Sequence, residues 1–364
     1  MKKNIPLLII VFLIVFQNCN QTKIGDNPQT IVLAGKIDNY DPNWQVIVGV
    51  NKIGLVPELM TAKTDIAGNF VATFESYVPL DVSISYKTFF WVLLHPGDSL
   101  FVKFDGKCND RFELLKTVDF KGDADMTNRY AAIFQKMYFS NEIYYDWDKK
   151  RRAVKEYDVD QYLQYLDTLR QKNKNIYNQF VAENHPDDES KKWAKLFSEK
   201  DYYHYLGWYA NNRRQMNLDH RWKVPKGFYD SLCTRLPIEP SMLIGAYLIN
   251  DFSEVFEHYV NDRLKDRETG FRWFVSPEGK LDGSPAIVDS IQIFGTIEFV
   301  SDPLLRQIML TMIFDRHFEK RNIAVYEQYL DVANKYIMEP FLKEPLTQKY
   351  LRVKQKIENC STCP

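Results

Sequence analysis

The sequence lacks the short motifs that usually mark a catalytic centre. It contains no Walker phosphate-binding loop, no G-x-G-x-x-G dinucleotide loop and no G-x-S-x-G nucleophile elbow. Its histidines show neither H-E-x-x-H nor any other metal-binding spacing. We therefore expect no metal, no cofactor and no catalytic residue, which favours a non-enzymatic role. The histidines are interpreted as solvated or hydrogen-bonded side chains: His95, His185, His204, His220, His258 and His317.

The chain also lacks an excess of positive charge and a repeat of fixed period. It has 47 Lys and Arg against 48 Asp and Glu, a formal net charge of −1 at pH 7. Removal of residues 1–18, argued below, takes away two lysines and no acidic residue, so the net charge falls from −1 to about −3. This charge argues against a nucleic-acid partner. The absence of a repeat argues against a solenoid.

Only one long apolar run is present, and it is too short for a membrane-spanning helix. Ile5–Phe16 is a run of twelve residues, whereas a spanning helix needs roughly 20 apolar residues. Two lysines precede the run and polar residues follow it, which is the layout of a signal peptide. We predict a cleaved signal peptide over residues 1–18. An uncleaved anchor is the weaker alternative, because residues 20–30 are too polar to extend the run.

A cysteine stands just after this apolar run. The stretch Val15–Cys19 resembles the lipobox of bacterial lipoproteins, although Phe16 and Asn18 replace the aliphatic and small residues of the consensus. We predict lipid attachment at Cys19, followed by a polar tether over residues 19–30. Each buried CH₂ of an acyl chain contributes about 0.8 kcal/mol, so several chains would hold the protein at a membrane. The alternative is a secreted protein cleaved near this cysteine.

From residue 31 onward the sequence consists of short β-branched and aromatic runs separated by turn residues. Phe70, Ala72 and Phe74 alternate with neighbours that point to the opposite face, so one face of this strand can be buried and the other wet. The pattern predicts an antiparallel β-sandwich domain over residues 31–122.

The hydrophobic period changes to a helical one after residue 122. Tyr162, Tyr165, Leu166 and Leu169 fall at i, i+3, i+4 and i+7, which places them on one face of a helix. We predict a mainly helical domain over residues 123–358, and hence an α+β fold in which an N-terminal β-sandwich is followed by helices. The stretch 265–284 is rich in Gly, Asp and Pro and predicts a long loop or a small hairpin.

Aromatic residues are unusually frequent, at 15% of the chain, with 24 Phe, 22 Tyr and 7 Trp. Such a surplus indicates either closely packed helices or exposed stacking platforms for ligands such as sugars. The stretch Tyr202–Tyr209 could frame a glycan cleft. At helical spacing, however, Tyr205, Trp208 and Tyr209 are better interpreted as core residues.

Short motifs lie along the region from about residue 31 to 360. They are Gly35 in the first predicted strand, the D-x-x-G-x-F turn of Asp65, Gly68 and Phe70, the turn Pro96, Gly97, Asp98, Ser99 and Leu100, and the junction residues Phe120, Gly122, Asn128 and Tyr130. With these residues the region resembles the N-terminal, non-catalytic region of exported thioredoxin-like thiol–disulfide interchange lipoproteins. The resemblance implies a small β-sandwich and a helical segment. In that family the thioredoxin-like domain would begin about where this chain stops, so the resemblance implies that the catalytic half is absent.

Cys360 and Cys363 form a C-x-x-C near the end of the chain. A redox dithiol places its first cysteine at the N-terminus of a helix, whereas only one residue follows this motif. We favour a small disulfide within a tail over residues 359–364. A catalytic redox pair and a metal-binding or non-functional tail are the alternatives, although two cysteines cannot complete a four-ligand zinc site. The pairing of Cys108 and Cys233 stays open.

Gly97–Leu100 spells the motif of the GDSL hydrolases, whose serine is the nucleophile, and Asp201 and His204 supply a D-x-x-H. In that family the serine follows the first strand of an α/β core and the D-x-x-H lies near the C-terminus. Here Ser99 follows several predicted strands, and 160 residues follow His204. We therefore favour a Pro-Gly-Asp β-turn.

These observations favour an exported lipoprotein with a non-catalytic binding or accessory role at the cell envelope, periplasmic or at the outer membrane. Its binding surface would lie between the sandwich and the helices. The alternatives are a component or remnant of a thiol–disulfide oxidoreductase system and a glycan-binding lipoprotein. The expected partners are the membrane, reached through the N-terminal lipid, and an envelope protein or a thioredoxin-like domain.

Overall fold

A computed structural model gives an α+β fold, 58% helical and 18% strand, with two N-terminal sheets followed by helices, which confirms the predicted fold class. The structure describes residues 27–141, 146–217, 224–230, 232, 239–266 and 285–361. The predicted signal peptide, Cys19, Cys233, Cys363 and nearly all of the predicted loop 265–284 lie outside the described residues. The predicted domain boundaries remain predictions.

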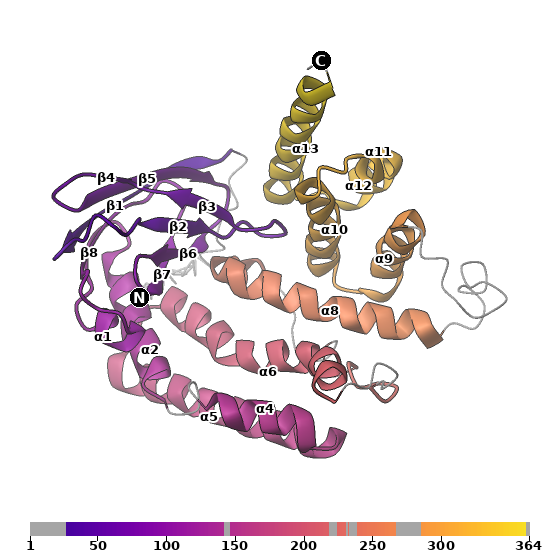
Figure 1. The fold of residues 1–364 in the computed structure, drawn as a ribbon, viewed down its shortest axis with the longest axis horizontal. Coiled ribbons are helices and arrows are strands. Elements are labelled where there is room, and N and C mark those ends of the chain that lie inside the picture. Colours follow the sequence, from indigo (N-terminus) through magenta and orange to yellow (C-terminus); the bar gives the residue numbers. More distant parts are fainter. Residues whose placement is uncertain are drawn as a thin grey trace, which may run out of the picture.

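Two sheets pack face to face in the N-terminal part (Figure 1). The strand order of the first sheet is β4-β5-β1-β8-β9, and that of the second sheet is β3-β2-β6-β7. The first sheet is made of β1 (Gln29–Asp38), β4 (Lys63–Thr64), β5 (Asn69–Ser76), β8 (Ser99–Asp105) and β9 (Asp119–Gly122). The second is made of β2 (Ile47–Val50), β3 (Glu58–Thr61), β6 (Leu80–Ser85) and β7 (Phe89–Leu94).

One strand pairing departs from the antiparallel pattern. β1 and β8 run parallel, with Val32 opposite Ser99 and Asp38 opposite Asp105, whereas the other pairings of the described strands are antiparallel. Parallel neighbours need a long crossover, because the chain must return to the end at which it started. In this protein β6 and β7 of the second sheet lie within that crossover.

The core of the sandwich follows from the alternation of side chains along the strands. In β5, Phe70, Ala72 and Phe74 are buried and the residues between them are exposed, as their two-residue period predicts. Phe104 of β8 lies between the sheets, its ring centroid 6.2 Å from that of Phe70 and 5.7 Å from that of Phe90 in β7. These aromatic contacts join the two sheets into one core.

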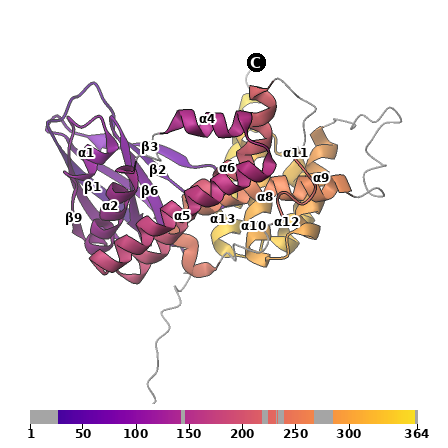
Figure 2. The ribbon, with the colours of Figure 1, turned by 90° about the horizontal axis from the view of Figure 1, so that it is seen from below.

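Helices follow the sandwich and pack on its second sheet (Figures 1 and 2). α5, α6 and α8 lie side by side, and α13 carries the chain to its C-terminal end. Among the described residues, no helix is long and apolar enough to cross a membrane. The helices are α1 (Arg111–Leu115), α2 (Asp125–Phe139), α4 (Trp147–Glu156), α5 (Val159–Asn184), α6 (Asp188–Met216), η1 (Pro240–Gly245), α8 (Ala246–Asp266), α9 (Pro285–Phe299), α10 (Pro303–Glu319), α11 (Ala324–Gln328), α12 (Leu330–Tyr336) and α13 (Pro340–Ser361).

Strands β6 and β7 of the second sheet are buried on both faces, whereas β3 at its edge is largely exposed. β6 and β7 consist almost entirely of buried residues, because helices cover the face that points away from the first sheet. The Trp91 ring of β7 lies 5.2 Å from the Phe197 ring of α6 and 6.3 Å from the Phe139 ring of α2. Here the aromatic surplus of the sequence serves to pack helices on a sheet.

Helix α2 covers the outer edge of β7 with two carboxamide side chains. Asn128 accepts a hydrogen bond from the Leu93 N–H and donates one to the Leu93 carbonyl, both at 2.8 Å. Gln135 makes the same two bonds with Trp91 at 2.9 Å. Residues seven apart on a helix share a face, and residues two apart on a strand direct their backbone groups to the same edge. The two amides therefore take the place of a neighbouring strand.

Candidate functional site

The loop between β2 and β3, here called the junction loop (residues 51–57), is held against the helices by polar side chains. Asn250 of α8 accepts a hydrogen bond from the Gly54 N–H at 2.8 Å and donates to another loop carbonyl at 3.0 Å. Asp315 of α10, which is fully buried, accepts from the Val56 N–H at 2.8 Å. Because these bonds satisfy loop backbone groups that have lost water, the junction loop has a fixed position.

Asp81 of β6 ties the second sheet to α6 and α8. Its buried carboxylate accepts hydrogen bonds from the Trp193 indole N–H at 3.2 Å and from the Tyr247 backbone N–H at 2.8 Å. Burial raises the pKa of Asp81 to about 6, and these donors offset only part of that effect. Asp81 therefore links the β-sandwich to the helices.

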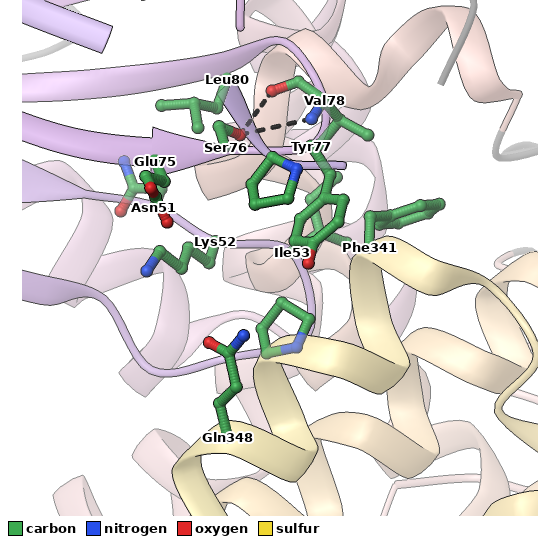
Figure 3. A pocket seen from close by; sticks show the side chains of 12 residues that line it. Asn51, Lys52, Ile53, Glu75, Ser76, Tyr77, Val78, Leu80, Phe341 and Gln348 are labelled. Atoms are coloured by element: carbon green, nitrogen blue, oxygen red, sulfur yellow. Dashed lines mark hydrogen bonds between the residues drawn. The ribbon is translucent and has the colours of Figure 1, made fainter. Parts of the chain in front are cut away.

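A narrow pocket follows the seam between the sandwich and α13 (Figure 3). Lys52 and Tyr77 line it from the strand side, and Phe341 and Gln348 line it from α13. Its volume of about 60 Å³ holds a few water molecules, whereas small-molecule sites measure roughly 300–1,000 Å³. Burial, together with a hydrogen bond to Glu344, raises the pKa of Tyr77 to about 12. We therefore interpret this pocket as a packing gap between the sandwich and α13 and not as a ligand site.

A larger space of about 410 Å³, the α13 hollow, opens beside the junction loop between β3, β5, α10 and α13. Charges of both signs line it. Lys52 lies 3.0 Å from Glu58 in an exposed ion pair. Lys349 pairs with Asp315 at 2.7 Å and also contacts Glu319. The α13 hollow therefore offers polar contacts of both signs to a ligand.

A second space of about 280 Å³, the α8 hollow, lies between the junction loop, α8 and α10. Leu55, Val56 and Pro57 line both hollows, so the two spaces meet along the junction loop. Met312 of α10 and the Tyr247 ring of α8 complete the less polar part of the wall. We call the two hollows together the junction groove.

The α8 hollow carries an excess of carboxylates. The Arg316 guanidinium is already bound to Glu257, with 2.8 Å between Nη1 and Oε2. The Asp251 carboxylate lies 3.1 Å from Nδ1 of His204. Glu254 has no hydrogen bond or ion pair with any described residue. Burial raises the pKa of Glu254, and nearby Arg316 opposes this while Asp251 adds to it.

The structure does not assemble the catalytic set suggested by the G-D-S-L and D-x-x-H motifs. Ser99 begins β8, and its N–H donates to the Asp123 carboxylate at 2.9 Å. Asp201 and His204 both lie on α6, and no described contact joins either of them to Ser99. Gly97 has a φ of +92°, which fits the favoured Pro-Gly-Asp turn.

Asp201 belongs to a buried polar cluster of the helical part. It pairs with Lys200 at 2.7 Å and accepts a hydrogen bond from the Tyr138 hydroxyl. Burial raises the pKa of Asp201, but Lys200 and Tyr138 lower it more, so the pKa stays below its ordinary value. The carboxylate is therefore charged and internally neutralised.

Of the five cysteines, the structure describes Cys108 and the backbone of Cys360. Cys108 is a half-buried free thiol, and burial together with Asp105 and Glu113 raises its pKa, which disfavours the reactive thiolate. The backbone of Cys360 is helical, because α13 continues to Ser361. Lipid attachment at Cys19 and a disulfide between Cys360 and Cys363 remain predictions.

The histidines of the described residues form separate contacts. His95 lies between Asp98 and Glu189, and His204 lies beside Asp251. Among the described residues, no group of three or more His, Cys, Asp or Glu side chains could hold a metal ion.

The prediction that Tyr205, Trp208 and Tyr209 are core residues is wrong for Trp208. Tyr209 is fully buried and Tyr205 is partly buried, but Trp208 is 54% exposed. Tyr202 and Leu206 mark the buried face of α6. At about 100° per residue, Trp208 lies nearly opposite that face, so a spacing of three from Tyr205 did not place it inside.

Sequence reasoning missed the residues that build the junction groove. Asn250, Glu254, Asp315 and Arg316 occupy helical positions without a recognisable motif. Their partners in the junction loop lie 196 residues away from Asn250 and 259 residues away from Asp315. The one available signal was Asp315, an acidic residue within the apolar helical run of α10. An Asp in such a run is rarely buried without a partner.

Comparison of the chain with protein-family models, with curated proteins and with solved structures finds no match.

Proposed function

We propose that the protein is a lipid-anchored binding protein of the cell envelope that uses the junction groove as its ligand site. One observation carries the proposal: two hollows of about 280 and 410 Å³ meet along a loop that partly buried Asn250 and fully buried Asp315 hold in place. Such a concave surface is formed before the ligand arrives, so binding need not include the entropy cost of ordering the loop.

The groove is suited to binding more than to chemical conversion. Among the carboxylates with altered pKa values, Asp81 and Asp201 are committed to buried structural contacts outside the hollows. Asp315, whose pKa is raised by burial, lines the α8 hollow but is bound to the Val56 N–H and to Lys349. Glu254, the other carboxylate of this hollow with a raised pKa, has no nucleophile or second catalytic group bound to it among the described residues. Within the α8 hollow, Arg316 is held by Glu257. These pairings favour recognition by shape and charge.

The proposed lipid would keep the groove near a membrane. Pro28, just before β1, lines the narrow seam pocket beside α13. Residue 27, where the described chain begins, stands eight positions after Cys19, and an extended chain of that length reaches roughly 30 Å. A ligand of the groove would therefore be a molecule of the envelope or its surface.

Two experiments in a bacterial host test the proposal. Radiolabelled palmitate should enter the wild type and not Cys19→Ala. A photo-crosslinking amino acid at Val56, which is exposed at the centre of the groove, should give discrete crosslinked products in intact cells. The same amino acid at Ile66, fully exposed in the β4–β5 turn, is the matched control.

Palmitate labelling that persists in Cys19→Ala contradicts the lipid anchor. Equal products at Val56 and Ile66, or none at Val56, contradict the binding site.

A glycan ligand is a second candidate, favoured by exposed aromatic rings outside the groove. Trp147 and Trp208 are each 54% exposed. Trp208 lies 4.6 Å from the His204 ring, and Lys150 lies over the Trp147 and Tyr205 rings. Quenching of tryptophan fluorescence by oligosaccharides, lost in Trp208→Ala, would support this candidate. The described contacts provide no comparable support for the oxidoreductase alternative.

A further inference from the structure

We propose that the α8 hollow receives a lysine or arginine side chain of a partner polypeptide. This inference rests on the proposed binding role of the junction groove and names the chemistry that the groove recognises.

The wall of the hollow matches the stem of a long basic side chain. Leu55, Val56 and Met312 supply aliphatic surface from two sides. Tyr247, which is 37% exposed, presents an aromatic ring. Lys and Arg bury their methylene stems along such surfaces, and their charged ends are attracted to the face of an aromatic ring.

The charges of the hollow match the end of that side chain. Glu254 carries a carboxylate that no described residue binds, and Asp251 stands one helical turn before it. The local cations are already engaged, Arg316 by Glu257 and Lys349 by Asp315. An incoming ammonium or guanidinium group would therefore meet uncompensated negative charge, whereas an anion would be repelled.

The neighbouring α13 hollow distinguishes a polypeptide from a free polyamine. The two hollows meet across Val56, so a ligand longer than one side chain passes from one to the other. A polyamine would bring only ammonium groups to the α13 hollow, in which Lys52, Lys349 and Arg352 stand among Glu58, Glu75 and Glu319. A peptide instead brings neutral backbone amides, which can bond to carboxylates and cations alike.

The test uses peptides of defined charge and a reporter inside the hollow. The probes are the acetylated, amidated pentapeptide Ala-Ala-Lys-Ala-Ala, its arginine and acetyl-lysine counterparts, spermidine and chitotriose. The protein carries ¹³C-labelled methionine methyl groups. Met312 lines the hollow, and Met126 on α2, 53% exposed, is the internal control. The methyl signal that disappears in Met312→Leu is assigned to Met312, the reporter.

We expect the lysine and arginine peptides to shift the Met312 signal in a saturable way and to leave Met126 unchanged. The acetyl-lysine peptide should not bind. Glu254→Gln should weaken binding of the lysine peptide at least about tenfold, since a bond to a charged group is lost. Because Glu254 has no partner among the described residues, this variant should melt like the wild type. Glu113→Gln, a remote exposed change on α1, should bind normally.

Each other outcome overturns the inference. Equal shifts from the lysine and acetyl-lysine peptides would show that charge is not recognised. A Met312 shift from spermidine or chitotriose alone would assign the hollow to a polyamine or a saccharide. If no peptide shifts Met312 while crosslinking at Val56 persists, the charge assignment fails and the binding role stands. If both fail, the proposed function fails.

Discussion

At the scale of single residues, His95 shows how one side chain can join the sandwich to the helices. Its Nε2 lies 2.7 Å from Glu189 on α6, and its Nδ1 lies 3.2 Å from Asp98 in the turn before β8. The hydrogen bonds to Asp98 and Glu189 raise the pKa of His95 to about 10, and burial opposes them only in part. The imidazolium is therefore charged at neutral pH, although the sequence offered no reason to distinguish this histidine from the others.

We predict that the contribution of His95 to the stability of the protein is lost at alkaline pH. Because its folded pKa is raised above the ordinary value, its contribution is complete below pH 6.5 and is lost as the pH rises through about 10. Two bonds to charged groups suggest that His95→Gln costs about 2 kcal/mol at pH 7. Urea unfolding of both proteins at pH 7 and pH 10 tests this. The difference between them should shrink at pH 10, and a constant difference would contradict the prediction.

At the scale of elements, α2 and β7 depend on each other. We predict that Asn128→Leu lowers the free energy of unfolding by about 2–4 kcal/mol, because the buried Leu93 N–H and carbonyl lose their partners. Met126→Leu, on the exposed side of the same helix, is the control and should change little. Denaturant unfolding measures both variants. Equal stability of Asn128→Leu and the wild type would show that water or backbone movement satisfies the strand edge.

The elements themselves were largely readable from the sequence, but their partners were not. The alternation of Phe70, Ala72 and Phe74 and the helical stripe through Tyr162 depend on neighbours within one strand or helix, and both were predicted correctly. The parallel pairing of β1 and β8 depends on a crossover through the other sheet. Likewise, nothing near Asn128 in sequence indicates that it binds a strand residue 35 positions away.

At the scale of the whole molecule, the sandwich and the helices share a continuous hydrophobic core. We predict a single cooperative thermal transition, because Asp81, Asn250 and Asp315 link the two parts and Trp91 packs between them. Scanning calorimetry of the full chain measures this. A fragment ending at Gly122 should fail to fold, since it lacks α2 and leaves the edge of β7 uncovered. Two resolved transitions in the full chain would show that the parts are independent.

We also predict that the protein has no intrinsic disulfide-reductase activity. Turnover needs a stabilised thiolate, whereas Cys360 stands at the C-terminal end of α13, where the helix dipole disfavours negative charge. Insulin reduction with dithiothreitol as the electron donor should proceed at the background rate, in the wild type as in Cys360→Ser/Cys363→Ser. A faster rate in the wild type that disappears in the double variant would make the oxidoreductase alternative the leading one.

The two side-chain amides that cover the edge of β7 also determine how this protein could associate with copies of itself. A β-sheet with two accessible edges can add strands at both and grow without limit into a fibre. The second sheet has one edge occupied by Asn128 and Gln135, while β3 at the other edge has no further neighbouring strand among the described residues. Pairing through this sheet would therefore join β3 to β3 and end at a dimer, because neither outer edge could accept a third copy.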